Sequence, residues 1–235
     1  MAVSQGLVAF NAAVSPTIPW FPAPVLALIL LATWGVNRRW PIRIAQPASG
    51  RAYAFALLAT YAVVSFGVLE SWLKDMTETA PAWPSQDVSA SFQIMFLLVF
   101  PFVVTLLAEV GFRGLMQTAL EKILPLWPML FLIAVLNYLM HFYNPEVAGM
   151  FVRIICMNLV WGYITWRVQS LRPALVAHVV MNIAVPLLQY ASEQYGPGPV
   201  PFGDFPASTL AISALCGTVA LAVALYVAKD LPERV

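Results

Sequence analysis

Hydrophobic stretches long enough to cross a lipid bilayer dominate the sequence, and they constrain its fold more than any other feature. A transmembrane helix needs about 20 mostly apolar residues to cross a hydrocarbon core of about 30 Å. Only 10% of the residues are charged and 61% are hydrophobic, whereas a soluble domain carries about 25% charged residues. We predict an all-α membrane protein, a single transmembrane domain over residues 1–235 that forms a polytopic bundle of about seven helices. The predicted spans are 18–36, 52–72, 91–120, 126–142, 147–166, 173–191 and 207–228.

The distribution of charge predicts the orientation of the bundle. With seven spans, most basic residues fall on one side, and they are Arg38, Arg39, Arg43, Arg51, Arg113, Lys122, Arg167, Arg172, Lys229 and Arg234. The other side carries the acidic residues Glu70, Asp75, Glu78, Asp87, Glu146, Glu193 and Asp204. Because basic loops stay in the cytoplasm, we expect the N-terminus outside and the C-terminus in the cytoplasm. Small size and short loops favour a bacterial inner membrane, and a net charge of +1 gives no reason to expect a nucleic-acid partner.

Three predicted spans contain polar residues that are expensive to place in a membrane. These residues are Glu109 and Arg113, Asn137 and His141, and His178 and Asn182. Ionisable side chains at membrane depth are functional candidates by default. The four-residue spacing places Glu109 and Arg113 on one helix face, where they can form an ion pair, and it does the same for His178 and Asn182. A purely structural reading is an ion pair and hydrogen bonds that hold helices together.

This set of side chains permits three kinds of chemistry. A carboxylate and an imidazole can activate water by general-base catalysis. A histidine and an asparagine on one face can donate hydrogen bonds to a developing oxyanion. Alternatively, two histidines and one glutamate can bind zinc and leave one position open, although the sequence has no HExxH motif. We therefore expect no cofactor, with zinc as the alternative.

The motifs around these residues resemble the CPBP family of intramembrane proteases, named for CAAX proteases and bacteriocin-processing enzymes and also called the Abi family. Its signature is EExxxR, usually within EExxFRG, then FxxxH, then HxxxN or HxxxD. Residues 108–114, AEVGFRG, match the first motif except at the first position. Asn137 replaces the usual Phe of the second motif, whose histidine is His141, and the third motif is complete in His178 and Asn182. The resemblance covers about residues 95–190.

The resemblance implies a glutamic-type intramembrane endopeptidase. In the family, the first glutamate of the pair and the histidine of the second motif activate the attacking water. Carried over, His141 orients the water, and His178 and Asn182 form the oxyanion hole. Glu109 and Arg113 would then support the site.

The departure from the family pattern falls on the general base, because position 108 is Ala. Three explanations are open: an active enzyme that was inactivated by substitution, a natural pseudoenzyme that binds without cutting, or a shifted site in which Glu109 is the base. Successive residues of an α-helix point about 100° apart, so Glu109 cannot take the place of residue 108 unless the helix rotates or distorts. We expect the chain as written to be nearly inert.

The expected partners are the lipid bilayer and a membrane-associated peptide or protein substrate. By resemblance, the candidates are a prenylated CAAX-like tail, a bacteriocin or pheromone precursor, and a C-terminal sorting signal. The alternative function is non-catalytic, as an immunity or scaffold protein or a small transporter. One geometric problem is open: His178 falls early in its span and His141 late, so the two histidines meet only if spans are shifted or tilted.

Overall fold

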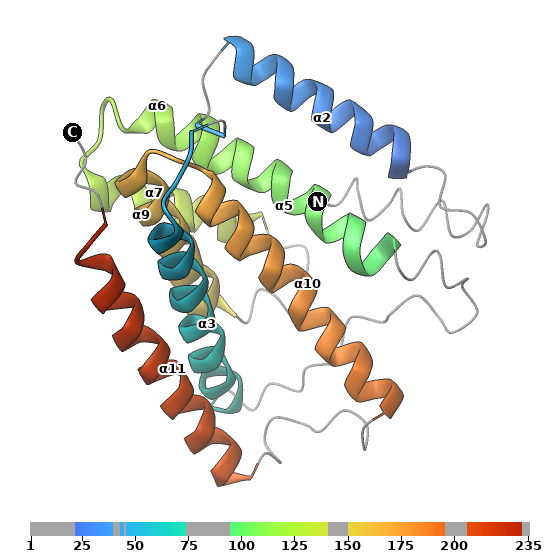
Figure 1. Cartoon of the computed structure of the whole chain (residues 1–235), viewed down its shortest axis with the longest axis vertical. Coiled ribbons are helices and arrows are strands. Elements are labelled where there is room, and N and C mark those ends of the chain that lie inside the picture. Colours follow the sequence, from blue (N-terminus) through green and yellow to red (C-terminus); the bar gives the residue numbers. More distant parts are fainter. Residues whose placement is uncertain are drawn as a thin grey trace.

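The computed structural model describes residues 22–39, 43–44, 46–73, 95–140, 150–195 and 206–231, and within these ranges every regular element is a helix (Figure 1). Seven helical stretches occur within these described ranges, one at each predicted span, which confirms the all-α fold class. They are α2 (Pro22–Arg39), α3 (Gly50–Leu73), the continuous stretch η1 (Met95–Val99), α5 (Phe100–Ala108), η2 (Glu109–Gln117) and α6 (Thr118–Leu120), then α7 (Leu126–Leu139), α9 (Phe151–Val168), α10 (Arg172–Tyr195) and α11 (Ala207–Ala228).

Three of these helical stretches are long and apolar enough to cross a membrane, namely Gly50–Leu69, Leu97–Leu120 and Ala207–Ala228. Leu126–Leu139 and Arg172–Val185 are shorter apolar helices. Large apolar side chains point outwards, and α11 alone exposes Ile212, Leu215, Val219, Leu225 and Tyr226. A water-soluble monomer rarely exposes so much contiguous apolar surface, so these side chains face lipid.

Small residues allow α3 and α11 to pack side by side, as Figure 1 shows at the edge of the bundle. Ala52, Ala56 and Ala59 are buried on α3. A Cβ atom on Gly217 of α11 would lie only 3.1 Å from the Cβ of Ser65. Close backbone approach through small residues is the usual way in which membrane helices associate. On its other side α3 packs against α9 and α10, and α10 also packs against α5.

The helical stretch 95–120 is not a regular α-helix, contrary to the sequence-based expectation. Its first and third segments, Met95–Val99 and Glu109–Gln117, are π-helical. Pro101 explains the first, because proline has no N–H to donate and its ring clashes with the carbonyl four residues before it. The second begins at Glu109 itself and contains Gly111 and Gly114, which offer little steric resistance. π-turns widen the helix and often occur at functional sites.

The linker before α3 ties several helices together at one end of the bundle. Arg43 forms a bidentate ion pair with Glu121, with N–O distances of 2.8 and 2.9 Å. The carbonyl oxygen of Arg43 accepts a hydrogen bond from the backbone N–H of Leu171, and the Ser170 hydroxyl donates to the Gln46 carbonyl. This linker therefore fixes the end of the stretch 95–120 against the turn between α9 and α10.

Candidate active site

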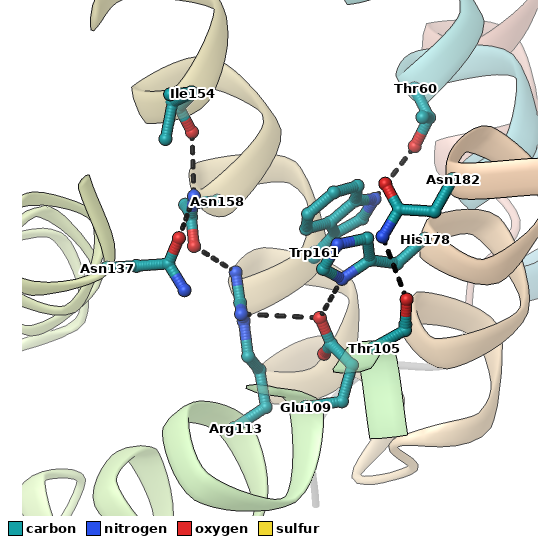
Figure 2. Close-up of polar contacts among 10 residues, drawn as sticks. All are labelled: Thr60, Thr105, Glu109, Arg113, Asn137, Ile154, Asn158, Trp161, His178 and Asn182. Carbon is teal, nitrogen blue, oxygen red and sulfur yellow. Dashed lines mark hydrogen bonds and ion pairs between the residues drawn. The ribbon is translucent and has the colours of Figure 1, made fainter. Parts of the chain in front are cut away.

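Two polar contacts, one helical turn apart, join the stretch 95–120 to α10 (Figure 2). The Nδ1 atom of His178 lies 2.7 Å from Oε1 of Glu109. One turn earlier on α5, the hydroxyl of Thr105 accepts a hydrogen bond of 2.9 Å from Nδ2 of Asn182. An ionised carboxylate can only accept hydrogen bonds, so Nδ1 of His178 donates this bond when Glu109 is ionised. The two antiparallel helices thus place the predicted residues His178 and Asn182 on one shared face.

The predicted ion pair between Glu109 and Arg113 is present and completely enclosed. The Nη1 atom of Arg113 lies 3.2 Å from Oε1 of Glu109, and neither side chain has any exposed surface. The same carboxylate oxygen therefore faces both the Arg113 guanidinium and the His178 imidazole. The other oxygen, Oε2, is buried and accepts no hydrogen bond from the residues that the structure describes.

Arg113 extends the polar network to α9 and α7. Its Nη2 atom donates to Oδ1 of Asn158. Asn158 in turn donates through Nδ2 to the carbonyl of Ile154 at 2.8 Å and lies 3.2 Å from Oδ1 of Asn137. Asn137 occupies the place where the CPBP motif usually has Phe, and here it is hydrogen-bonded and buried. The contacts therefore run without a break from His178 on α10 to Asn137 on α7.

An aromatic side chain completes the surroundings of His178. The Trp161 indole of α9 stacks on the imidazole, with ring centroids 3.9 Å apart and an angle of 18° between the planes. The guanidinium carbon of Arg113 lies 5.5 Å from the centroid of the same indole. The indole N–H donates a hydrogen bond of 2.8 Å to the hydroxyl of Thr60 on α3. Four helical stretches thus contribute to the immediate environment of His178.

Sequence reasoning missed Asn158, Trp161, Thr105 and Thr60. Asn158 carried a usable signal, because an amide in the middle of an apolar span needs a hydrogen-bond partner. Trp161 carried another, since membrane tryptophans concentrate at span ends and this one lies well inside its helix. Thr105 is one turn before Glu109 on the same face. The sequence contained no comparable sign for Thr60.

The two remaining predicted positions are Ala108 and His141. Ala108 is the last residue of α5 and is only partly buried, whereas the next residue, Glu109, is fully enclosed. Its i,i+3 spacing from Thr105 makes the two side chains neighbours on the helix surface. His141 lies outside the described residues, so its predicted meeting with His178 is untested; its sequence neighbour one turn earlier is Asn137.

No group of three or more His, Cys, Asp or Glu side chains that could hold a metal ion occurs in the part of the chain that the structure describes. The zinc alternative requires His141 as a ligand, and His141 is not in that part. Around His178 the described ionisable groups are Glu109 and Arg113, which form an ion-paired cluster.

Residues 90–184 match the family model described as Type II CAAX prenyl endopeptidase Rce1-like. This central segment is similar to the Rce1-like endopeptidases. The match confirms the resemblance to the CPBP proteases, and the Rce1-like segment contains every residue of the network except Thr60. No curated protein and no solved structure matches the chain. The Rce1-like segment and the long apolar helices together indicate an integral membrane protein related to membrane endopeptidases.

Proposed function

We propose that the bundle is the scaffold of a glutamic-type intramembrane endopeptidase, and that the chain with Ala108 is inert because it lacks the general base. In this proposal a glutamate at position 108 and His141 activate the attacking water. His178 and Asn182 stabilise the oxyanion, while Glu109 and Arg113 hold His178 in place. The substrate is a membrane-anchored peptide or protein, with a prenylated tail, a bacteriocin precursor or a C-terminal sorting signal as the candidates.

The main support for placing the general base at position 108 is that Glu109 is fully buried. A general base must reach a water molecule beside the scissile carbonyl. Glu109 has no exposed surface, and one of its oxygens is shared by Arg113 and His178. Those contacts suit a group that positions its neighbours and balances their charge. Position 108 is less enclosed and lies beside Thr105, the partner of Asn182, which favours it over Glu109 as the position of the base.

The donors of the proposed oxyanion hole are oriented by these same contacts. Glu109 accepts from Nδ1 of His178, and a doubly protonated imidazole would still have its Nε2–H to donate. The amide of Asn182 has two N–H bonds, of which one is used by Thr105. Donors fixed before the reaction stabilise developing negative charge without reorganisation, and each contributes about 10²–10³-fold to the rate.

The decisive experiment introduces the missing carboxylate. Ala108→Glu in liposomes should cleave a fluorogenic farnesylated CAAX peptide, or a membrane-anchored peptide with an apolar C-terminal tail, at least about 10²-fold faster than the parent. Ala108→Gln is the matched control, because it has the same size without the carboxylate. Activity should also disappear in Ala108→Glu combined with His178→Ala, and a chelator should leave it unchanged.

Two results would contradict the proposal. Cleavage by the parent, which has no carboxylate at position 108, would favour the shifted site in which Glu109 is the base. Absence of cleavage by folded Ala108→Glu on both kinds of substrate would favour the non-catalytic functions, an immunity or scaffold protein or a small transporter.

A further inference from the structure

We infer that Trp161 and Thr60 form a positioning pair for His178, which brings α3, a helix outside the Rce1-like segment, into the active site. The positioning of the His178 ring follows from geometry alone. Its importance for catalysis rests on the proposed function. Trp161 stacks on the imidazole, and Thr60 fixes the far end of the indole. Neither residue belongs to the three motifs of the family signature.

The hydrogen bond to Glu109 does not by itself define the plane of the His178 ring. The torsion about the Cβ–Cγ bond of histidine is broad, so the imidazole can rock about that bond while Nδ1 stays within hydrogen-bonding distance of the carboxylate. A nearly parallel indole at 3.9 Å removes that freedom. The carboxylate therefore sets the direction of one ring nitrogen and the indole sets the plane in which the other nitrogen lies.

Trp161 can impose this plane only if it is itself fixed. Its side chain is 3% exposed and Thr60 is 4% exposed, so neither has much contact with solvent or lipid. A buried indole N–H without an acceptor costs about 1–3 kcal/mol, and the Thr60 hydroxyl removes this cost with a bond of 2.8 Å. α3 is held against α9 and α10 by the buried core that includes Phe55, Ala59 and Trp161, which makes it a rigid support.

The position of Trp161 also suits the charge of its neighbours. Its ring faces the His178 imidazole and lies within 5.5 Å of the Arg113 guanidinium carbon. An aromatic face attracts cations, most strongly when they are shielded from water. Both partners of the Glu109 carboxylate thus lie beside one indole, which links the orientation of the imidazole to that of the guanidinium.

Histidine NMR tests the positioning without any need for activity, because the chain has only two histidines. In protein labelled at histidine and held in detergent micelles, the signals lost in His178→Gln are those of His178. The ring current of the stacked indole should place their proton resonances upfield, and Trp161→Leu should move them downfield. Thr60→Val should shift them partly in the same direction, and Thr60→Ser, which keeps the hydroxyl, should not.

Kinetic measurements in the Ala108→Glu background test whether the position of the His178 ring matters for catalysis. Trp161→Phe keeps an aromatic ring but has no N–H, and Thr60→Val has no hydroxyl, so each removes the same hydrogen bond. We expect each to lower kcat about tenfold with KM nearly unchanged, and the double variant to be no slower than either single one. Two substitutions serve as controls. Trp127→Phe changes an exposed tryptophan, and Thr218→Val removes a hydroxyl that donates a hydrogen bond only within its own helix.

The outcomes separate this inference from the proposed function. If the His178 signals do not move in Trp161→Leu, the positioning pair is refuted, whatever the activity. If they move while Ala108→Glu cleaves neither peptide, the pair stands and the endopeptidase proposal fails. Additive losses in the double variant, about a hundredfold, would refute the shared role of Trp161 and Thr60.

Discussion

Glu109 and Arg113 are opposite charges that the fold removes entirely from solvent. Neither side chain is exposed, and their closest atoms are 3.2 Å apart. A buried ion pair contributes little net stability, because desolvation of both charges offsets their attraction. Removal of one partner is different, since it leaves the other as an uncompensated charge in the apolar interior.

We therefore predict opposite behaviour for single and double substitutions at this pair. Glu109→Gln keeps an acceptor for His178 but leaves the Arg113 guanidinium as a buried charge without a counter-charge. It should therefore destabilise the protein by about 3–5 kcal/mol. Glu109→Gln combined with Arg113→Met removes both charges and should recover a large part of that loss. Thermal unfolding in detergent measures both variants. A double variant at least as unstable as Glu109→Gln would show that charge compensation is not the main role of the pair.

At this scale the sequence predicts contacts within a helix better than contacts between helices. The i,i+4 spacing was sufficient to predict the Glu109–Arg113 pair, since both residues lie on one helix. The contact of Glu109 with His178 depends on how two helices are rotated and shifted against each other. Spacing along the chain contains no information on that rotation. Trp161 and Thr60 come from two further helices, and for the same reason no motif search groups them with His178.

The helices themselves were largely predictable, because hydropathy alone sets the length of a membrane span. The last predicted span coincides with α11, Ala207–Ala228, and the others agree within a few residues at most ends. The π-helical segment at Glu109 was not predictable in this way. It depends on local backbone packing and not on apolar periodicity, so the assumption of regular α-helical geometry was wrong there.

α9 lies very close to α7 and to the stretch 95–120 at Gly162. A Cβ on Gly162 would lie 2.7 Å from Cδ2 of Leu130, a fully buried side chain on α7, and 3.5 Å from Oε1 of Gln117. The carbonyl of Gly162 also accepts a hydrogen bond of 3.0 Å from Nε2 of Gln117. Gly162 therefore sets the distance between α9, which carries Asn158 and Trp161, and the segment that carries Glu109.

We predict that Gly162→Ala destabilises the bundle relative to Gly35→Ala. Both substitutions gain the helix propensity of alanine, about 1 kcal/mol, but a Cβ on Gly35 of α2 meets no atom within 4 Å. The difference between the two variants thus isolates the overpacking at Leu130, which should cost about 1–3 kcal/mol. Thermal unfolding of the two variants side by side measures it. Equal stability would mean that Leu130 moves away at no cost.

On the scale of the whole molecule, three residues of the polar network lie at a similar distance from one end of the bundle. Glu109 is eleven residues before the end of α6 at Leu120, Asn137 eleven after the start of α7 at Leu126, and Asn158 ten before the end of α9 at Val168. At 1.5 Å per residue, each lies roughly 15 Å from the same end of the bundle. The short length of α7 thus explains how Asn137, late in its helix, can contact residues in the middle of longer helices. Under the proposed function, a network at this distance from the span ends would act on a substrate that enters the membrane.

That end of the bundle is the basic one. Arg51 pairs with Asp230 at 3.1 Å and Arg43 with Glu121 at 2.8 Å, while Arg172 donates to the carbonyl of Ile44 and Arg167 to that of Leu231. These contacts bring the end of α11 and the starts of α3 and α10 together, as Figure 1 shows. Basic residues near span ends are retained in the cytoplasm, so this end should face the cytoplasm.

We predict that a fluorescent protein fused after Val235 folds and fluoresces in a bacterial host, and that alkaline phosphatase fused there is inactive. A fusion within residues 196–205, between α10 and α11, should give the reverse pattern, because one span separates the two points. The paired fusions control for expression, since each reporter is tested on both sides. Active phosphatase at the C-terminus would invert the bundle and place the basic end outside.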